Sequence, residues 1–189
     1  MRWLCSRLDD FTAEEYGKAY EALTPGRKAR IDRYRRQEDR MRSLAGELLA
    51  KRLAREMGDE APVVENLPSG QPVLRSSRLH LSIAHSADRV ACAVSLQPVG
   101  IDIEQVRPFR AGMLRHVCTE EEREFVLQGQ EAQGEITDPR ILDRFFEIWT
   151  GKEAWFKKAG TGIQNLQSVQ VLSLPREVHR VEDYIIQIM

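Results

Sequence analysis

Two short segments carry side chains that could together hold a divalent cation and a polyphosphate. In the segment 99–104, Asp102 and Glu104 stand two apart among Val and Ile residues, which is the pattern of a strand whose alternate side chains share one face. Some fifty positions later, Glu153 and Lys157 lie four apart in a helical pattern, so they share one helix face. A few carboxylate oxygens, completed by water and phosphate, are suitable ligands for Mg²⁺.

The same residues have an alternative interpretation. Acids that alternate with apolar residues more often belong to a half-exposed strand. A Glu and a Lys one turn apart usually stabilise a solvated helix. Spacing alone therefore leaves both a metal site and an ordinary surface open.

The elements that must position these residues begin with helices. Thr12, with a glutamate three residues later, forms a capping box that predicts the start of a short helix. Thr24 and Pro25 predict the start of a second helical stretch that runs to Gly58, with a break near Gln37.

A loop-rich segment follows over residues 59–78, and the order predicted after it is a hairpin, a strand, two helices and two closing strands. Their positions are residues 79–84 and 90–95 for the hairpin, 99–104 for the strand, a helix from Thr119, a helix of about twenty residues from Asp138 to Gly160, and strands 169–174 and 184–189. A helix followed by strands thus occurs twice, which favours an α+β fold.

Composition limits the class of protein. The chain has 189 residues, 42% of them hydrophobic, and a net charge of −1, as expected for a globular protein of one domain or two small ones. No run approaches the ~20 apolar residues of a membrane span, and the apolar stretch within the first ten residues is too short for a signal peptide. Cys5, Cys92 and Cys118 are widely separated and odd in number, which predicts neither disulfides nor a zinc site and favours the cytoplasm.

Charge is unevenly distributed. Residues 27–55 hold eleven Lys or Arg against four acids, a balance of +7, and residues 119–147 hold nine acids against three basic residues, a balance of −6. A basic segment attracts anions such as phosphates, an acidic protein or nucleic acid, although a solvated helix face would look the same. Tyr34 is the only aromatic residue among these arginines, which argues against single-stranded nucleic acid.

Two motifs resemble the paired signature of the Sfp-type 4′-phosphopantetheinyl transferases. Gly-Ile-Asp-Ile-Glu at 100–104 is similar to that family's G-[IV]-D-[IV]-E strand. The run that begins at Trp149 is similar to its W-x-x-K-E-[AS]-x-x-K helix and G-x-G turn, with matches at Trp149, Lys152, Glu153, Ala154, Lys157, Gly160 and Gly162.

Three further segments resemble this family in the expected order, so that the resemblance covers about residues 25–165. Residues 39–46 are similar to its E-D-x-x-R-x-L-x-G helix, residues 70–72 to G-K-P, and residues 81–86 to N-[IL]-S-H-S. Two departures stand out. Gln71 replaces the usual lysine and Ala84 the usual serine, and both are expected to weaken coenzyme A recognition modestly.

The resemblance implies an architecture. It predicts an α+β fold of two similar lobes related by a pseudo-two-fold axis, each a small antiparallel sheet packed with a long helix. The lobes are expected at residues 1–98, on the side of the coenzyme A 3′-phosphate, and 99–189, with the metal and catalytic residues. Family members usually continue further after the equivalent of Tyr184, so the resemblance leaves two alternatives: a final sheet that is one strand short, or a sequence that is a piece of a longer chain. The protein is expected to be a monomer with its site in the cleft.

The resemblance also implies a reaction. A serine of an apo carrier protein attacks the β-phosphorus of coenzyme A, takes the 4′-phosphopantetheine arm and releases 3′,5′-ADP. Asp102, Glu104 and Glu153 would hold Mg²⁺, and Lys157 would donate to the pyrophosphate. The alternative role of Lys157 is a surface ion pair.

Three more residues receive roles by resemblance. Glu120 stands where the family places its general base, although Thr119 and Glu122 with their neighbouring acids also form a capping box. Arg42 and His85 would bind the 3′-phosphate of coenzyme A, and the planar fork of an arginine suits a phosphate. A histidine in a turn is otherwise an ordinary polar residue.

These expectations together describe a magnesium-dependent transferase, a holo-[acyl-carrier-protein] synthase, that uses coenzyme A as substrate. Its partner is expected to be an acidic acyl or peptidyl carrier protein, with neither nucleic acid nor membrane involved. An alternative is a module that binds coenzyme A or a carrier protein without transfer activity. A nucleic-acid-binding helix would depend on residues 27–55 alone.

Overall fold

The computed structural model describes residues 1–189, and its first half consists of a sheet with helices on one side. Strand β1 opens the chain and the hairpin β4–β5 closes this half, with three helices and a short two-stranded sheet between them. The elements are β1 (Arg2–Arg7), a 3₁₀ turn (Leu8–Asp10), α1 (Ala13–Glu21), α2 (Pro25–Asp32), α3 (Gln37–Glu56), β2 (Val64–Asn66), β3 (Pro72–Leu74), β4 (His80–Ser86) and β5 (Arg89–Ser95).

The second half begins with a strand and ends with a hairpin. Between them lie two short helices, a two-stranded ribbon and the longest helix of the chain. The elements are β6 (Ile101–Gln105), β7 (Phe109–Arg110), α4 (Gly112–Val117), α5 (Glu120–Leu127), β8 (Glu135–Ile136), α6 (Pro139–Ala159), a 3₁₀ turn (Leu166–Ser168), β9 (Glu177–Val181) and β10 (Tyr184–Ile188).

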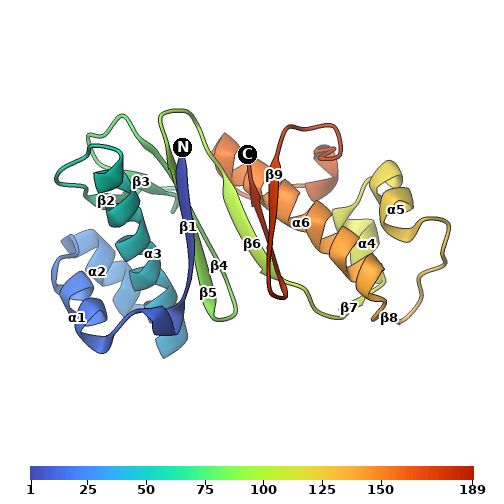
Figure 1. Cartoon of the computed structure of the whole chain (residues 1–189), viewed down its shortest axis with the longest axis horizontal. Helices are drawn as coiled ribbons and strands as arrows, with labels where there is room; N and C mark the ends of the chain where they lie inside the picture. Colours follow the sequence, from blue (N-terminus) through green and yellow to red (C-terminus); the bar gives the residue numbers. More distant parts are fainter.

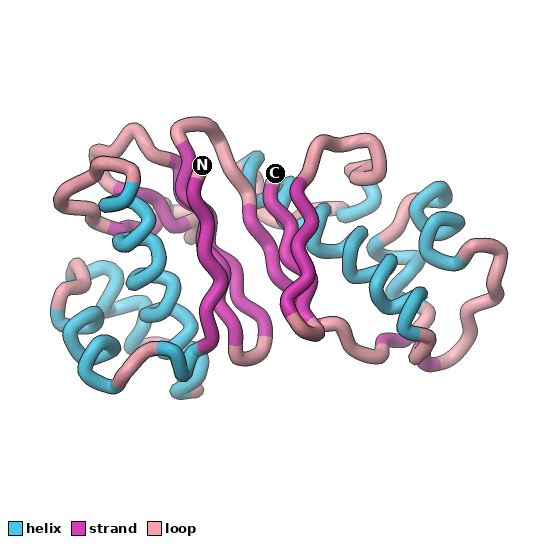
Figure 2. Tube along the Cα trace, viewed as in Figure 1, coloured by secondary structure: helices cyan, strands magenta, loops and turns pink.

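Two three-stranded antiparallel sheets occupy the middle of the molecule (Figures 1 and 2). Their strand orders are β1-β5-β4 and β6-β10-β9, and β4 of the first sheet packs against β6 of the second. Helix α3 covers the first sheet, and α6 covers β6 and β10. The predicted α+β class with small antiparallel sheets is confirmed, whereas the pseudo-two-fold axis and the lobe boundary at 98/99 stay predictions.

Three clusters of buried apolar side chains explain why this arrangement holds together. One cluster lies wholly within residues 8–94 and a second wholly within residues 109–185. A third contains nine buried residues from both halves, among them Ala91 and Ala93 of β5 and Ile101 and Ile103 of β6. Because burying a large aliphatic side chain stabilises a protein by about 1.5–3 kcal/mol, this shared cluster binds the two halves to each other.

The predicted helix starts are confirmed by their caps. The hydroxyl of Thr12 accepts from the N–H of Glu15, and Thr24 and Thr119 cap α2 and α5 in the same way. Helix α6 runs from an Asp138 cap to a glycine with φ +68°, a left-handed conformation that glycine adopts at no steric cost. The predicted break near Gln37 is the interval between α2 and α3.

One predicted strand is wrong. Residues 169–171 have no regular secondary structure and residues 172–174 form a turn, because Val169 and Val171 are buried in the second core without a strand partner and Pro175 has no N–H to donate. The guanidinium of Arg176 instead donates to the carbonyl of Val171 at 2.7 Å. The strand that pairs with β10 is β9, one turn later in the sequence.

Several elements lie where no element was predicted: β1, the short two-stranded sheets β2–β3 and β7–β8, β9, and α4 in the interval between β6 and α5. The final sheet has three strands, as many as the first. No helix of this fold combines the length and the apolar character needed to cross a membrane.

Candidate functional site

The strand and the helix that carry the predicted metal ligands meet at a glycine. Gly100 immediately precedes β6, and a methyl group there would lie 1.8 Å from the carbonyl oxygen of Ala154 and 2.7 Å from the backbone nitrogen of Lys158 in α6. Any side chain at this position would therefore force the strand away from the helix. The absence of a side chain at Gly100 lets residues some fifty positions apart share one site.

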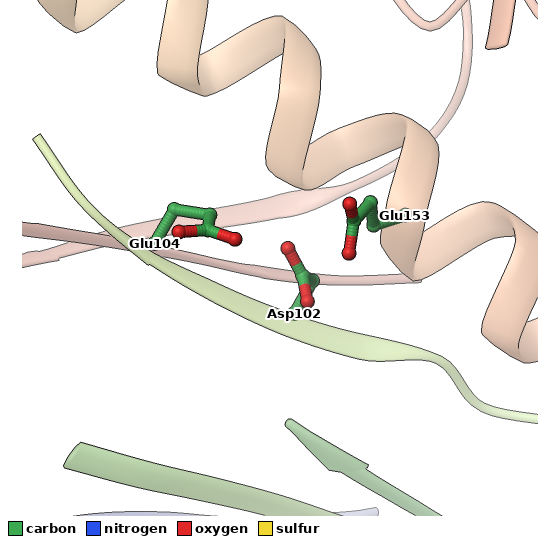
Figure 3. A group of neighbouring side chains, drawn as sticks. All are labelled: Asp102, Glu104 and Glu153. Carbon is green, nitrogen blue, oxygen red and sulfur yellow. The ribbon is translucent and has the colours of Figure 1, made fainter. Parts of the chain in front are cut away.

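Asp102, Glu104 and Glu153 converge in this region, as Figure 3 shows. One oxygen from each carboxylate lies within 4.8 Å of the corresponding oxygen of the others. Asp102 and Glu104 project from β6 toward α6, and Glu153 projects from α6 toward β6 (Figure 3). The predicted grouping of these three side chains is thus present in the fold.

A different neighbour orients each carboxylate. Lys157 Nζ donates to Asp102 Oδ1 at 2.6 Å, and Trp149 Nε1 donates to Glu153 Oε1 at 2.7 Å. The hydroxyl of Ser86, on β4 of the other half, donates to Glu104 Oε2 at 2.9 Å. Each carboxylate therefore has one oxygen fixed by a donor.

The second oxygen of Asp102 shows that the group suits a cation. Asp102 is 2% exposed, and its Oδ2 is buried without a hydrogen-bond partner. Burial is the main reason that the pKa of Asp102 is raised to about 8; Lys157 opposes this shift and Glu153 adds to it. Burial likewise raises the pKa of Glu104. Three clustered carboxylates with an unpartnered buried oxygen fit a hard divalent cation such as Mg²⁺.

A cavity of about 290 Å³ adjoins Lys157. Two of the sequence motifs face each other across it: the turn at Gly160–Gly162 and the segment Ser69–Pro72. Gln71 stands where the resemblance predicts a lysine. It lies close to Gly160: a methyl group on Gly160 would be 3.1 Å from the side-chain oxygen of Gln71. Segments from both halves thus line a single cavity beside Lys157.

Arg42 and His85 lie near each other at the end of the β4–β5 hairpin. Arg42 Nε donates to the carbonyl of Ala87 at 2.8 Å, and its Nη1 donates to Asp39 at 2.7 Å. His85 is exposed at its outer side, but desolvation by the surrounding protein lowers the pKa of its imidazole, and the charges of Lys157 and Arg42 lower it further. Cationic groups from α3 and α6 therefore surround His85, which makes this corner attractive to an anion.

Glu120 is not brought into this group. It is exposed at the start of α5, and its carboxylate pairs with Arg123 on the same helix. Figure 1 shows α5 and β6 on opposite sides of α6. The geometry therefore lends no support to Glu120 as the general base.

One buried ion pair next to the site was not predicted from the sequence. Lys152 and Glu122 form an ion pair of 2.6 Å in which both side chains are completely buried. Lys152 also donates to the carbonyl of Leu166, and Glu122 accepts from the N–H groups of Thr119 and Val171. The capping box pointed to Glu122, but nothing in the pattern indicated that its carboxylate would face the lysine beside Glu153.

Comparison with known proteins identifies a family to which this chain is similar. A model of the 4′-phosphopantetheinyl transferase superfamily matches residues 98–186, which include all three carboxylates. The chain is 33% identical over 165 residues to 4′-phosphopantetheinyl transferase psf-1 of Bacillus pumilus, covering 82% of this chain and 66% of that protein. It is 31% identical to 4′-phosphopantetheinyl transferase gsp of Aneurinibacillus migulanus, covering 69% of this chain and 53% of that protein.

A third similar protein is 4′-phosphopantetheinyl transferase HetI of a Nostoc species, 29% identical over 185 residues, with 94% of this chain and 73% of that protein covered. The chain spans about two thirds or less of the length of the first two relatives. The match over residues 98–186, the similarity to several such transferases and the α+β fold agree with one another. The chain therefore belongs to the 4′-phosphopantetheinyl transferase superfamily.

Proposed function

We propose that this protein transfers the 4′-phosphopantetheine arm of coenzyme A to a serine of an apo carrier protein and releases 3′,5′-ADP. The observation that carries the proposal is the convergence of Asp102, Glu104 and Glu153, with Asp102 Oδ2 buried and unpartnered, in a chain of this superfamily. We place the reaction in the cytoplasm, with the protein as a monomer and an acidic acyl or peptidyl carrier protein as its partner.

In this reaction the serine oxygen forms a bond to the β-phosphorus, the bond from that phosphorus to the bridging oxygen breaks so that this oxygen leaves with 3′,5′-ADP, and the serine proton passes to solvent water. Asp102, Glu104 and Glu153 would hold Mg²⁺. When bound, the ion offsets the negative charge of the pyrophosphate and of the leaving group. The buried position of Asp102 suits this role, because an electrostatic interaction is stronger where water is excluded.

Lys157 would act on the pyrophosphate. Its ammonium group contacts Asp102 and also borders the cavity between the two halves, so it lies between the carboxylates and the space open to a substrate. From this position it can donate to a phosphate oxygen and stabilise charge on the leaving group. Arg42 and His85, on the neighbouring hairpin end, would bind the 3′-phosphate through charge-assisted hydrogen bonds.

The test is a transfer assay with purified protein, coenzyme A, Mg²⁺ and an apo carrier protein, read by mass spectrometry. We expect the carrier to gain the mass of one phosphopantetheine arm, and Asp102→Ala and Glu153→Ala to abolish the gain. Glu124→Ala, which removes an exposed carboxylate from α5, is the matched control and should keep full activity. Full transfer by both site variants would refute the metal assignment.

The same experiment addresses the binding-module alternative. If the wild-type protein binds coenzyme A and the carrier protein but no arm is transferred, the alternative holds and the proposal fails. For the phosphate-binding pair, we expect Arg42→Ala to raise the KM for coenzyme A about tenfold with kcat little changed, because a charge-assisted hydrogen bond contributes about 1.5–3 kcal/mol. A change in kcat alone would contradict that role.

A further inference from the structure

The two sheets are joined through serine side chains. Strands β4 and β6 pack together but belong to different sheets. Ser82 Oγ accepts from the N–H of Ile101 at 3.0 Å, and Ser86 Oγ accepts from the N–H of Gln105 at 3.1 Å. The two serines are four residues apart on one face of β4, as their two donors are on β6. Hydroxyl groups thus replace the backbone acceptors that a continuous sheet would supply.

Ser86 makes a second contact that Ser82 does not. Its hydroxyl donates to Glu104 Oε2 at 2.9 Å. A hydroxyl has one proton, and this bond uses it. The interaction fixes one oxygen of Glu104 and leaves the other for a cation. The residue that aligns the two halves is therefore also the residue that orients one carboxylate of the site.

The turn that follows Ser86 is held by both halves of the molecule. Arg42 donates to the carbonyl of Ala87, and the N–H of Leu8 donates to the carbonyl of Asp88 at 2.8 Å. From the second half, the hydroxyl of Tyr184 donates to the carboxylate of Asp88 at 2.5 Å. Ala87 has φ +47°, in the left-handed region that alanine rarely adopts, so the turn is held in a strained conformation by its surroundings.

We propose that Ser86 is a positioning residue for metal binding: it holds Glu104 in the orientation that completes the three-carboxylate site. The inference rests on the proposed function, because it takes Asp102, Glu104 and Glu153 as the ligands. Groups that hydrogen-bond to metal ligands commonly alter metal affinity by about 10–100-fold. The contact crosses from one half to the other, so a residue of the first half orients a metal ligand of the second.

Metal binding without substrate tests the inference. Mn²⁺ replaces Mg²⁺ as the probe, and its Kd is measured by electron paramagnetic resonance for the wild type, Ser86→Ala, Ser86→Thr and Ser82→Ala. Ser82→Ala is the matched control, because both alanine variants remove a hydroxyl of β4 that accepts an N–H of β6. We expect Ser86→Ala to weaken Mn²⁺ binding about tenfold, Ser86→Thr to restore most of it, and Ser82→Ala to stay within about twofold of the wild type.

Three outcomes would overturn the inference, and they differ in whether the proposed function fails as well. If Ser86→Ala keeps the wild-type affinity, Ser86 does not position Glu104, and the proposed function is untouched. If Ser82→Ala weakens binding as much as Ser86→Ala, the alignment of the halves and not the contact to Glu104 controls affinity. If the wild type does not bind Mn²⁺ at all, the metal centre of the proposed function fails together with the inference.

Discussion

Replacing Asp102 by asparagine should stabilise the metal-free protein. The unfolded chain releases the proton of Asp102 near pH 3.8, whereas burial keeps it on the folded chain until about pH 8. Between these pH values the folded state binds more protons than the unfolded state, so stability falls as pH rises. Asparagine resembles the protonated acid in shape and has no charge to lose, so Asp102→Asn should remove this dependence.

The size of the effect follows from the shift in pKa. A shift of this size corresponds to a destabilisation on the order of 5 kcal/mol at pH 8 and about 2 kcal/mol at pH 5. In EDTA, Asp102→Asn should therefore be more stable than the wild type at both pH values, with the larger gain at pH 8. Adding Mg²⁺ should stabilise the wild type, by about 2.7 kcal/mol at one hundred times its Kd, and leave the variant unchanged.

Urea unfolding at pH 5 and pH 8, in EDTA and in Mg²⁺, measures these differences. Asp143→Asn serves as the control, because Asp143 is an exposed acid that pairs with Arg180, and it should bring no gain at pH 8 in EDTA. The reasoning is refuted if Asp102→Asn is no more stable than the wild type at pH 8 in EDTA. In that case the charge of Lys157 would outweigh the loss of hydration.

Three further predictions concern the stability of the fold and the role of Glu120 as general base. Gly100→Ala should lower the Tm strongly and weaken Mn²⁺ binding, because the added methyl group would overlap the backbone of α6. Gly112→Ala is the control and should change the Tm little, because a methyl group at Gly112 would have no atom within 4 Å. Lys152→Met should destabilise by about 3–5 kcal/mol in urea unfolding, and adding Glu122→Gln should recover most of the loss, because an unpaired buried charge is costly. Glu120→Gln should change the rate of transfer less than twofold with an unaltered pH profile; a loss of tenfold or more would return Glu120 to the role of base.

Local signals in the sequence accounted for most of the helices. The caps at Thr12, Thr24, Thr119 and Asp138 depend on residues within a single turn, and such short-range chemistry is visible in one sequence. The strand predicted at residues 169–174 was wrong because alternating apolar side chains indicate burial but do not indicate whether a neighbouring strand is available for pairing.

The three carboxylates were found because their motifs are also local, even though the motifs lie fifty residues apart. Their environment could not be found in this way. The contact from Ser86 to Glu104 and the buried pair of Lys152 and Glu122 arise only when separate elements pack together. No spacing rule along the chain connects those positions.

The apolar cluster shared by the two halves limits how substrates can enter and leave. Separating the two halves would expose to water the isoleucine and alanine side chains that pack against one another in this cluster. Separation of the two halves is therefore unfavourable, and under the proposed function coenzyme A would enter and leave by movement of segments that line the cavity, such as the glycine turn after α6. Amide hydrogen exchange should accordingly be slowest at β6 and β10 and should remain so during turnover.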